Sequence, residues 1–209
     1  MKKLISLLAI IAMMLCVFSA NADETGKSLI FYYDYSENID TTGLDVDAIS
    51  QASMAGVQGR DKSNILLMAE ILKERTDAEV YALHVDELYP AEFNEMADIA
   101  KKQRDQGTVL AFQEALPDFS SYDVIYFGTP VWWFGAPQAI LTVLQQADFG
   151  NAKIVFFGIH GGSGFAGIPD AIQQYQPNVT IVDRFTVASE TDNDEVRTQF
   201  NAFLDQIAW

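Results

Sequence analysis

Short apolar runs that alternate with helical patterns constrain the fold of this chain more than any other feature. Five runs rich in β-branched and aromatic residues have the length of buried strands, and they span residues 28–33, 78–85, 123–128, 153–159 and 179–185. Helical patterns follow these runs at residues 63–76, 91–106, 136–147, 166–175 and 193–206. Near-continuous apolar strands that alternate with helices are typical of a parallel sheet covered on both faces. The sequence therefore predicts a doubly wound α/β fold.

The first 22 residues have the layout of a cleaved secretory signal. Lys2 and Lys3 precede an apolar run at 4–18, and Ala20-Asn21-Ala22 is an A-x-A cleavage site. The run is short for a membrane-spanning helix, and no stop-transfer pattern follows it. We therefore expect a signal peptide at 1–22, one folded domain at 23–209, no membrane anchor after cleavage, and a periplasmic or secreted location.

Charge and residue counts disfavour several classes of partner. The formal net charge of −16 predicts repulsion of nucleic acid and of anionic lipid, since both are bound mainly through cationic side chains. Cleavage would remove Cys16, the only cysteine, and leave His84 and His160 on different predicted strands. Thiolates and clustered imidazoles are the usual ligands of zinc, so we expect no metal site.

The loops after the predicted strands are where a ligand is expected, because open parallel sheets bind ligands beyond the carboxyl ends of their strands. The loop after the first strand contains Ser36 and runs into a long insert, which ends at Lys62, Ser63 and Asn64 at the start of a helix. Hydroxyls, an amide and the backbone N–H groups of a helix N-terminus can bind an anion. An ordinary helix cap with a solvated lysine is the alternative.

An aromatic loop, "GTPVWWFGAP" at residues 128–137, follows the third strand. Trp132, Trp133 and Phe134 could stack on a planar ligand, a contact worth about 0.5–1.5 kcal/mol beyond the burial of area. The alternative is that the rings fold back over the core. We expect at least one tryptophan to do so, because neighbouring side chains in an extended segment point in opposite directions.

A glycine-rich loop, "GIHGGSGFAG" at residues 158–167, follows the fourth strand, and its glycines would allow a ligand to approach the backbone. Gly162, Gly164 and Gly167 match the dinucleotide fingerprint G-x-G-x-x-G, with Asp183 at a suitable distance. That fingerprint usually lies on the first strand–helix turn. A hydrolase motif G-x-S-x-G fails, because Phe165 replaces its last glycine.

Together these loops resemble those of the flavodoxin-like family, in the branch with an expanded phosphate loop and an H-G-G-S-G segment. The resemblance extends from residue 28 to the C-terminus. It implies a flavodoxin-like fold, with five parallel strands in the order 2-1-3-4-5, helices on both faces, and one FMN bound without a covalent link. The chain departs from the family at "DKSN" (61–64), where flavodoxins commonly have a T-G-N-T-like turn.

The resemblance also implies which residues contact FMN. The residues that it places at the phosphate are Tyr35, Ser36, Lys62, Ser63 and Asn64. The residues that it places on one side of the isoalloxazine are Pro130, Trp132, Trp133 and Phe134. The residues that it places on the other side are His160, Gly161, Gly162, Ser163 and Gly164.

The implied function is redox. The flavin carries the chemistry, so no side chain of the protein is expected to act as a catalytic acid or base. The protein would transfer electrons outside the cytoplasm, or would reduce a quinone or a partner protein with FMN. Two alternatives stay open: a cofactor-free binding module that uses the same cleft, and an NAD(P)H-dependent oxidoreductase that uses the Gly162 loop.

Overall fold

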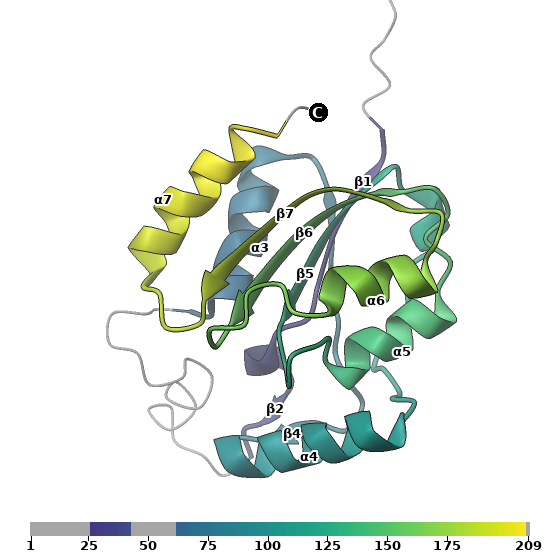
Figure 1. The fold of residues 1–209 in the computed structure, drawn as a ribbon, viewed down its shortest axis with the longest axis vertical. Helices are drawn as coiled ribbons and strands as arrows, with labels where there is room; N and C mark the ends of the chain where they lie inside the picture. Colours follow the sequence, from purple (N-terminus) through teal and green to yellow (C-terminus); the bar gives the residue numbers. More distant parts are fainter. Residues whose placement is uncertain (1–25, 43–61, 208–209) are drawn as a thin grey trace, which may run out of the picture.

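A computed structural model describes residues 26–42 and 62–207 of the chain (Figure 1). The predicted signal peptide and most of the insert after the first strand lie outside these residues. The described part contains a five-stranded parallel sheet in the order β3-β1-β5-β6-β7. Its strands are β1 (Ser28–Tyr32), β3 (Glu79–Ala82), β5 (Val124–Pro130), β6 (Lys153–His160) and β7 (Thr180–Ala188). This is the predicted order 2-1-3-4-5 of the five strands, so the predicted fold class is confirmed.

Strand β1, the second in the sheet order, is where the chain changes direction across the sheet. It pairs with β3 on one side and with β5 on the other, with Tyr32 opposite both Ala82 and Gly128. After β1 the chain forms β3 on one side of it. It then crosses to the other side of β1 and forms β5, β6 and β7 in turn. Loops that diverge at such a switch point leave a crevice at the carboxyl edge of the sheet.

Helices cover both faces of the sheet, as the continuous apolar strands predict. The helices are α3 (Asn64–Arg75), α4 (Phe93–Gln106), α5 (Gln138–Gln146), α6 (Ile168–Tyr175) and α7 (Asn193–Leu204). In Figure 1, α3 and α7 lie on one face, α5 and α6 lie on the other, and α4 lies beyond the carboxyl ends of the strands. Leu29 and Phe31 of β1 point into one apolar cluster, and Ile30 and Tyr32 point into the other.

Two helix starts follow the sequence closely. Ser63 is the N-cap of α3, as predicted, and its Oγ accepts the backbone N–H of Leu66 at 3.2 Å. Pro137 directly precedes α5. The second strand is shorter than its apolar run, which extends over 78–85, because its partner in the sheet, β1, ends at Tyr32, opposite Ala82.

The sequence did not predict the short elements in the loops. A single 3-10 turn, η1 (Tyr35–Glu37), follows β1 and leads into β2 (Ile39–Asp40). Strand β2 pairs in parallel with β4 (Tyr89–Pro90), and a second turn, η2 (Phe119–Ser121), precedes β5. Segments of two or three residues have no periodicity that a sequence pattern can reveal.

Asn38 holds this loop against the sheet. Its side chain is fully buried, and its Nδ2 donates to the carbonyls of Asp34 at 2.7 Å and Leu83 at 3.0 Å. Its Oδ1 accepts the N–H of Val85 at 2.7 Å. One amide group therefore satisfies three buried backbone groups from two segments that are far apart in sequence.

Within residues 26–42 and 62–207, no helix is both long enough and apolar enough to cross a membrane.

We expect Asn38→Ala to lower the free energy of unfolding by about 2–4 kcal/mol, because it leaves buried backbone groups without partners. Urea unfolding monitored by circular dichroism measures this. Asn151→Ala is the matched control, since Asn151 is exposed, and should stay within about 0.5 kcal/mol of the wild type. Equal losses in the two variants would contradict the assigned role of Asn38.

Candidate functional site

The three loops predicted to form a site meet at the carboxyl edge of the sheet. The ring of Tyr35, in the first loop, lies edge-to-face with Trp132 of the aromatic loop, with centroids 6.2 Å apart. The Tyr35 hydroxyl donates to the carbonyl of Pro90 at 2.7 Å. The carbonyl of Phe134 accepts the N–H of Gly167, in the glycine-rich loop, at 3.3 Å. The aromatic loop therefore bridges the other two.

The aromatic loop closes in a strained two-residue turn. The backbone N–H groups of Trp132 and Gly135 each donate to the carbonyl of the other residue at 3.0 Å. The two residues between them, Trp133 and Phe134, have φ values of 51° and 61°. Large side chains rarely adopt this left-handed conformation, which costs about 1–2 kcal/mol per residue. Such strain clusters at functional sites, where surrounding contacts maintain it.

Trp132 points inward, as the sequence predicted for at least one of the tryptophans. Its half-buried ring lies edge-to-face with Tyr33, at a centroid distance of 5.7 Å, and with Tyr89, at 5.6 Å. These contacts anchor one end of the turn to the core. Trp132 therefore supports the turn from the side of the core.

Trp133 is held by α4, whereas Phe134 points to solvent. The Nε1 of Trp133 donates to the carbonyl of Ala97 at 3.2 Å, and the guanidinium of Arg104 lies 5.6 Å from the centre of the indole. Arg104 also donates to the Trp133 carbonyl at 3.1 Å. Phe134 is 79% exposed, so it is the ring of this turn that is most available to a ligand.

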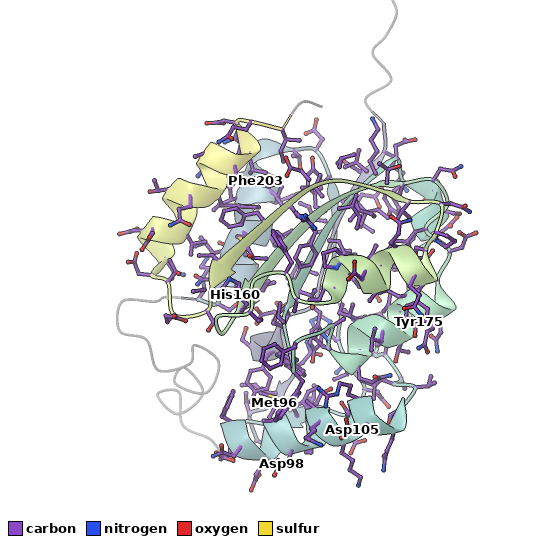
Figure 2. All side chains as sticks on the ribbon, in the orientation of Figure 1. Met96, Asp98, Asp105, His160, Tyr175 and Phe203 are labelled. Atoms are coloured by element: carbon purple, nitrogen blue, oxygen red, sulfur yellow. The ribbon has the colours of Figure 1, made fainter. Side chains whose placement is uncertain are left out.

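The glycine-rich loop presents open backbone. Gly162 and Gly164 have φ values of +101° and +60°, and a Cβ at Gly161, Gly162 or Gly164 would meet nothing within 4 Å. His160 is half-buried at the end of β6, and its Nδ1 accepts the N–H of Gly162 at 2.9 Å. This hydrogen bond fixes the start of the loop. In Figure 2, His160 lies toward the edge of the sheet where α4 lies.

Two other predicted residues lie in or beside this loop region. Pro130 is buried at the end of β5, and Ser163 is half-buried between the two left-handed glycines. Asp183, by contrast, does not match the position that a dinucleotide fingerprint requires. It lies in the first half of β7, opposite Val155, while the glycines follow the carboxyl end of β6. The acidic residue and the glycine loop are therefore separated along the sheet.

Asp34 lies at the centre of the first loop, and the sequence analysis missed it. The side chain is 3% exposed, and it accepts the backbone N–H of Ser36 at 2.7 Å together with the hydroxyls of Ser36 and Ser63. Burial raises the pKa of Asp34, while these hydrogen bonds oppose that rise. The pattern Asp-x-Ser after a strand is typical of an aspartate that caps its own turn. This pattern in the sequence could have predicted the role of Asp34.

The remaining residues predicted at a phosphate also have partners within the protein. Asn64 is fully buried, and its amide donates to the carbonyl of Thr191 at 2.9 Å and accepts from Asn193 at 2.9 Å. Lys62 binds the carboxylate of Glu70 at 2.7 Å. The start of α3 is therefore tied to the loop before α7, and its lysine lies in an ion pair.

The first loop carries a second perturbed carboxylate. Burial, and then the nearby charge of Asp34, raise the pKa of Glu37 above its ordinary value. Burial also raises the pKa of the neighbouring Tyr32 hydroxyl, and both carboxylates add to that rise. The described part of the first loop therefore carries two carboxylates where a phosphate was predicted. In the described part of the chain, no group of three or more His, Cys, Asp or Glu side chains could hold a metal ion.

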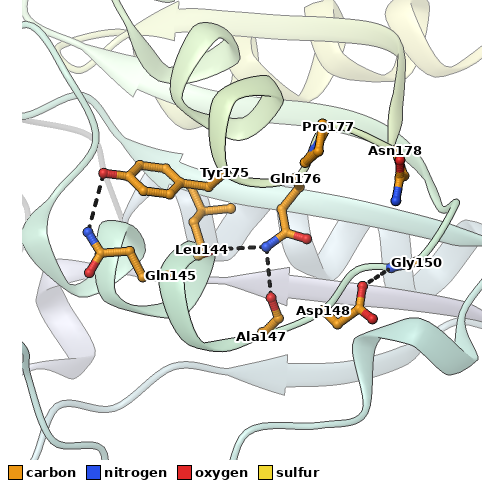
Figure 3. Close-up of a pocket in the computed structure, with 9 residues that line it drawn as sticks. All are labelled: Leu144, Gln145, Ala147, Asp148, Gly150, Tyr175, Gln176, Pro177 and Asn178. Atoms are coloured by element: carbon orange, nitrogen blue, oxygen red, sulfur yellow. Dashed lines mark hydrogen bonds between the residues drawn. The ribbon is translucent and has the colours of Figure 1, made fainter.

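An open hollow of about 380 Å³ lies at the opposite edge of the sheet (Figure 3). Its walls come from the ends of α5 and α6, before the amino ends of β6 and β7. The Nε2 of Gln176 donates to the carbonyls of Leu144 and Ala147, at 2.7 Å each. The main polar group of this hollow therefore joins two helix ends, which is a structural role.

Comparisons with known proteins agree with this architecture. The family model described as Flavodoxin matches residues 66–203. Among curated proteins no match is found. The solved structure of a flavoprotein in complex with FMN from Lactobacillus acidophilus NCFM is similar, with a TM-score of 0.53 and 20% sequence identity over 84% of this chain and 99% of that chain. A protein from Bacteroides uniformis ATCC 8492, named as a candidate flavoprotein, has a TM-score of 0.57 and 20% identity over 84% and 98% of the respective chains. At these identities the structural likeness shows the fold.

The strain in the aromatic turn can be measured. We expect Phe134→Gly to be more stable than Phe134→Ala by about 1 kcal/mol, because both variants lose an exposed ring but only glycine adopts a positive φ without strain. Urea unfolding of the two variants gives the difference directly. Equal stabilities would contradict a strained turn.

The buried carboxylate predicts a pH dependence. A folded-state pKa of Asp34 above the ordinary value of 3.8 means that the folded protein binds the proton more tightly than the unfolded chain. Stability from this group is therefore present at low pH and is lost as the pH rises through the folded-state pKa. We expect the free energy of unfolding of the wild type, relative to Asp34→Asn, to fall between pH 4 and pH 7. A relative stability that rises over this range would show that the pKa is lowered instead.

Proposed function

This chain belongs to the flavodoxin family, and from that premise we propose that it is an exported redox protein that binds FMN. The observation that carries the proposal is the strained turn at Trp133 and Phe134, which lies beside a glycine-rich loop with an open backbone. An exposed ring and a loop whose glycines leave the backbone open are suited to contact a flat ligand. The FMN complex of the similar Lactobacillus protein supports the choice of cofactor.

The described residues fit one half of FMN better than the other. Phe134 and the backbone of Gly161, Gly162 and Gly164 could flank the isoalloxazine, with Trp132 and Trp133 supporting the turn. On the phosphate side, Ser36, Ser63 and Lys62 bind protein carboxylates instead. Tyr35 and Asn64 donate to backbone carbonyls. The site therefore fits the ring of FMN, and it does not fit the phosphate in the arrangement described.

A bound flavin would supply electron transfer, and the protein would supply its position and its electrostatic surroundings. The carboxylates of Asp34 and Glu37 would oppose the accumulation of negative charge in the crevice, which lowers the reduction potential of a flavin there. We propose that electrons pass to a quinone or to a partner protein. The net charge of −16 would favour a basic partner.

We also propose that the protein acts outside the cytoplasm. The basic start, the apolar run and the A-x-A site of residues 1–22 support this, although these residues lie outside the described structure. Fractionation of the native host, followed by N-terminal sequencing, should find the protein outside the cytoplasm with Asp23 as its first residue. A cytoplasmic protein that still begins with Met1 would contradict the proposal.

A cofactor-free binding module is the second candidate, and one observation favours it. Ser36 and Ser63, the hydroxyls predicted to bind phosphate, already bind Asp34. The third candidate, a nicotinamide-dependent oxidoreductase, is less well supported, because Asp183 lies away from the glycine loop.

The absorbance spectrum of purified mature protein, followed by titration with FMN, tests flavin binding. We expect saturable quenching of flavin fluorescence, and Phe134→Ala should weaken binding about 2- to 12-fold, which corresponds to the loss of one aromatic contact. Tyr175→Ala is the matched control, because Tyr175 is an exposed aromatic residue at the opposite edge of the sheet and should leave binding unchanged. A protein that is colourless and does not respond to added FMN or riboflavin would favour the cofactor-free module.

A further inference from the structure

The donors predicted to bind a phosphate already bind an anion that belongs to the protein. Asp34 accepts the N–H and the hydroxyl of Ser36, and it also accepts the hydroxyl of Ser63. Ser63 is the N-cap of α3, so the carboxylate lies at the positive end of a helix of 12 residues. A carboxylate at this position makes the kinds of contact that a phosphate would make.

A phosphate monoester could not share these donors with an ionised Asp34. The ester carries about −1.5 to −2 charges near neutral pH, and like charges at contact distance repel each other strongly. Within residues 26–42 and 62–207, no cationic side chain is among the interactions recorded for Asp34. Burial, with the charge of Asp34 as a further cause, raises the pKa of Glu37 and of the Tyr32 and Tyr33 hydroxyls, so these groups lie within electrostatic reach of Asp34. The ammonium of Lys62 binds Glu70.

We infer that Asp34 is a specificity-determining residue, a built-in anion that makes the crevice bind the ring system of a flavin without recognising its phosphate. This inference rests on the proposed flavin-binding function and narrows its ligand class. Riboflavin and FMN share the isoalloxazine and differ by the terminal phosphate. The wild-type protein should therefore bind the two with similar affinity, whereas a site with an open phosphate cradle prefers FMN.

Asp34→Asn tests the inference, because it removes the charge and keeps the size of the side chain. The Oδ1 of asparagine can still accept one of the serine donors, and the other becomes available to a phosphate. A hydrogen bond to a charged group corresponds to a gain of about 10- to 100-fold in affinity. We therefore expect the ratio of the riboflavin Kd to the FMN Kd to lie within about 3-fold of one in the wild type and to rise to about 10–100 in the variant.

Fluorescence titrations of both flavins at constant ionic strength measure these ratios. Glu37→Gln is the matched control, because it removes a carboxylate from the same turn while Asp34 keeps its contacts with Ser36 and Ser63. Its ratio should stay within about 3-fold of the wild-type ratio. An equal rise in both variants would show a general effect of negative charge and would overturn the role assigned to Asp34.

A second measurement separates this inference from flavin binding itself. Inorganic phosphate at 10–50 mM, an order-of-magnitude range for a weak anion site, should raise the melting temperature of Asp34→Asn above that in matched sodium chloride, and should leave the wild type unchanged. If phosphate stabilises the variant and no flavin binds, the flavin function and the specificity role fail, and only the occupation of the anion-binding donors by Asp34 stands. If flavin binds and the wild type already prefers FMN more than 10-fold, the role of Asp34 fails and the function stands.

If Asp34→Asn does not fold, Asp34→Ser replaces it, because serine keeps a small polar side chain in the loop. The wild-type ratio is informative without any variant. Absence of flavin binding in all proteins, together with no phosphate effect on the variant, would overturn both proposals.

Discussion

The position of β1 between β3 and β5 is the constraint on which the rest of this structure depends. The strand forms parallel ladders on both edges, and the ladder to β5 continues beyond its end, where the N–H of Tyr33 donates to the carbonyl of Gly128 at 2.9 Å. A Cβ at Gly128 would lie 2.2 Å from the ring of Phe157, so this packing requires glycine. The ladder brings the loops after β1 and β5 side by side, and the candidate site follows from that adjacency.

The aromatic turn combines rigid support with exposed rings, of which Phe134 is 79% and Trp133 43% exposed. Trp132 packs on buried tyrosines, and Trp133 is held by three contacts with α4. These contacts offset the strain of the left-handed turn, which in turn leaves Phe134 in solvent. On the other side of β1, Asp34 satisfies the serines that would otherwise bind a ligand. Ring recognition and phosphate recognition are thus separable parts of this site.

The sequence predicted the strands, the helices and the three loops, because each depends on a repeating pattern or a distinctive composition. The order of the strands in the sheet was implied by the resemblance to the flavodoxin-like family. The sequence also placed Ser63 at the start of α3. It did not predict β2 and β4, which pair over two residues each, or the burial of Asn38 and Asp34. Short polar side chains in a loop look alike in sequence, whether they face solvent or satisfy buried backbone groups.

The sequence by itself determined that this protein is a parallel α/β domain with aromatic and glycine-rich loops at one edge, since apolar periodicity and loop composition are local properties. Only the tertiary structure decided which ring faces solvent and which anion the first loop holds. Trp133 bends back because α4 offers a carbonyl and an arginine, and Ser63 meets Asp34 because α3 starts beside the end of β1. These contacts join segments that are distant in sequence, so they form only when the chain folds and cannot be predicted from a local pattern.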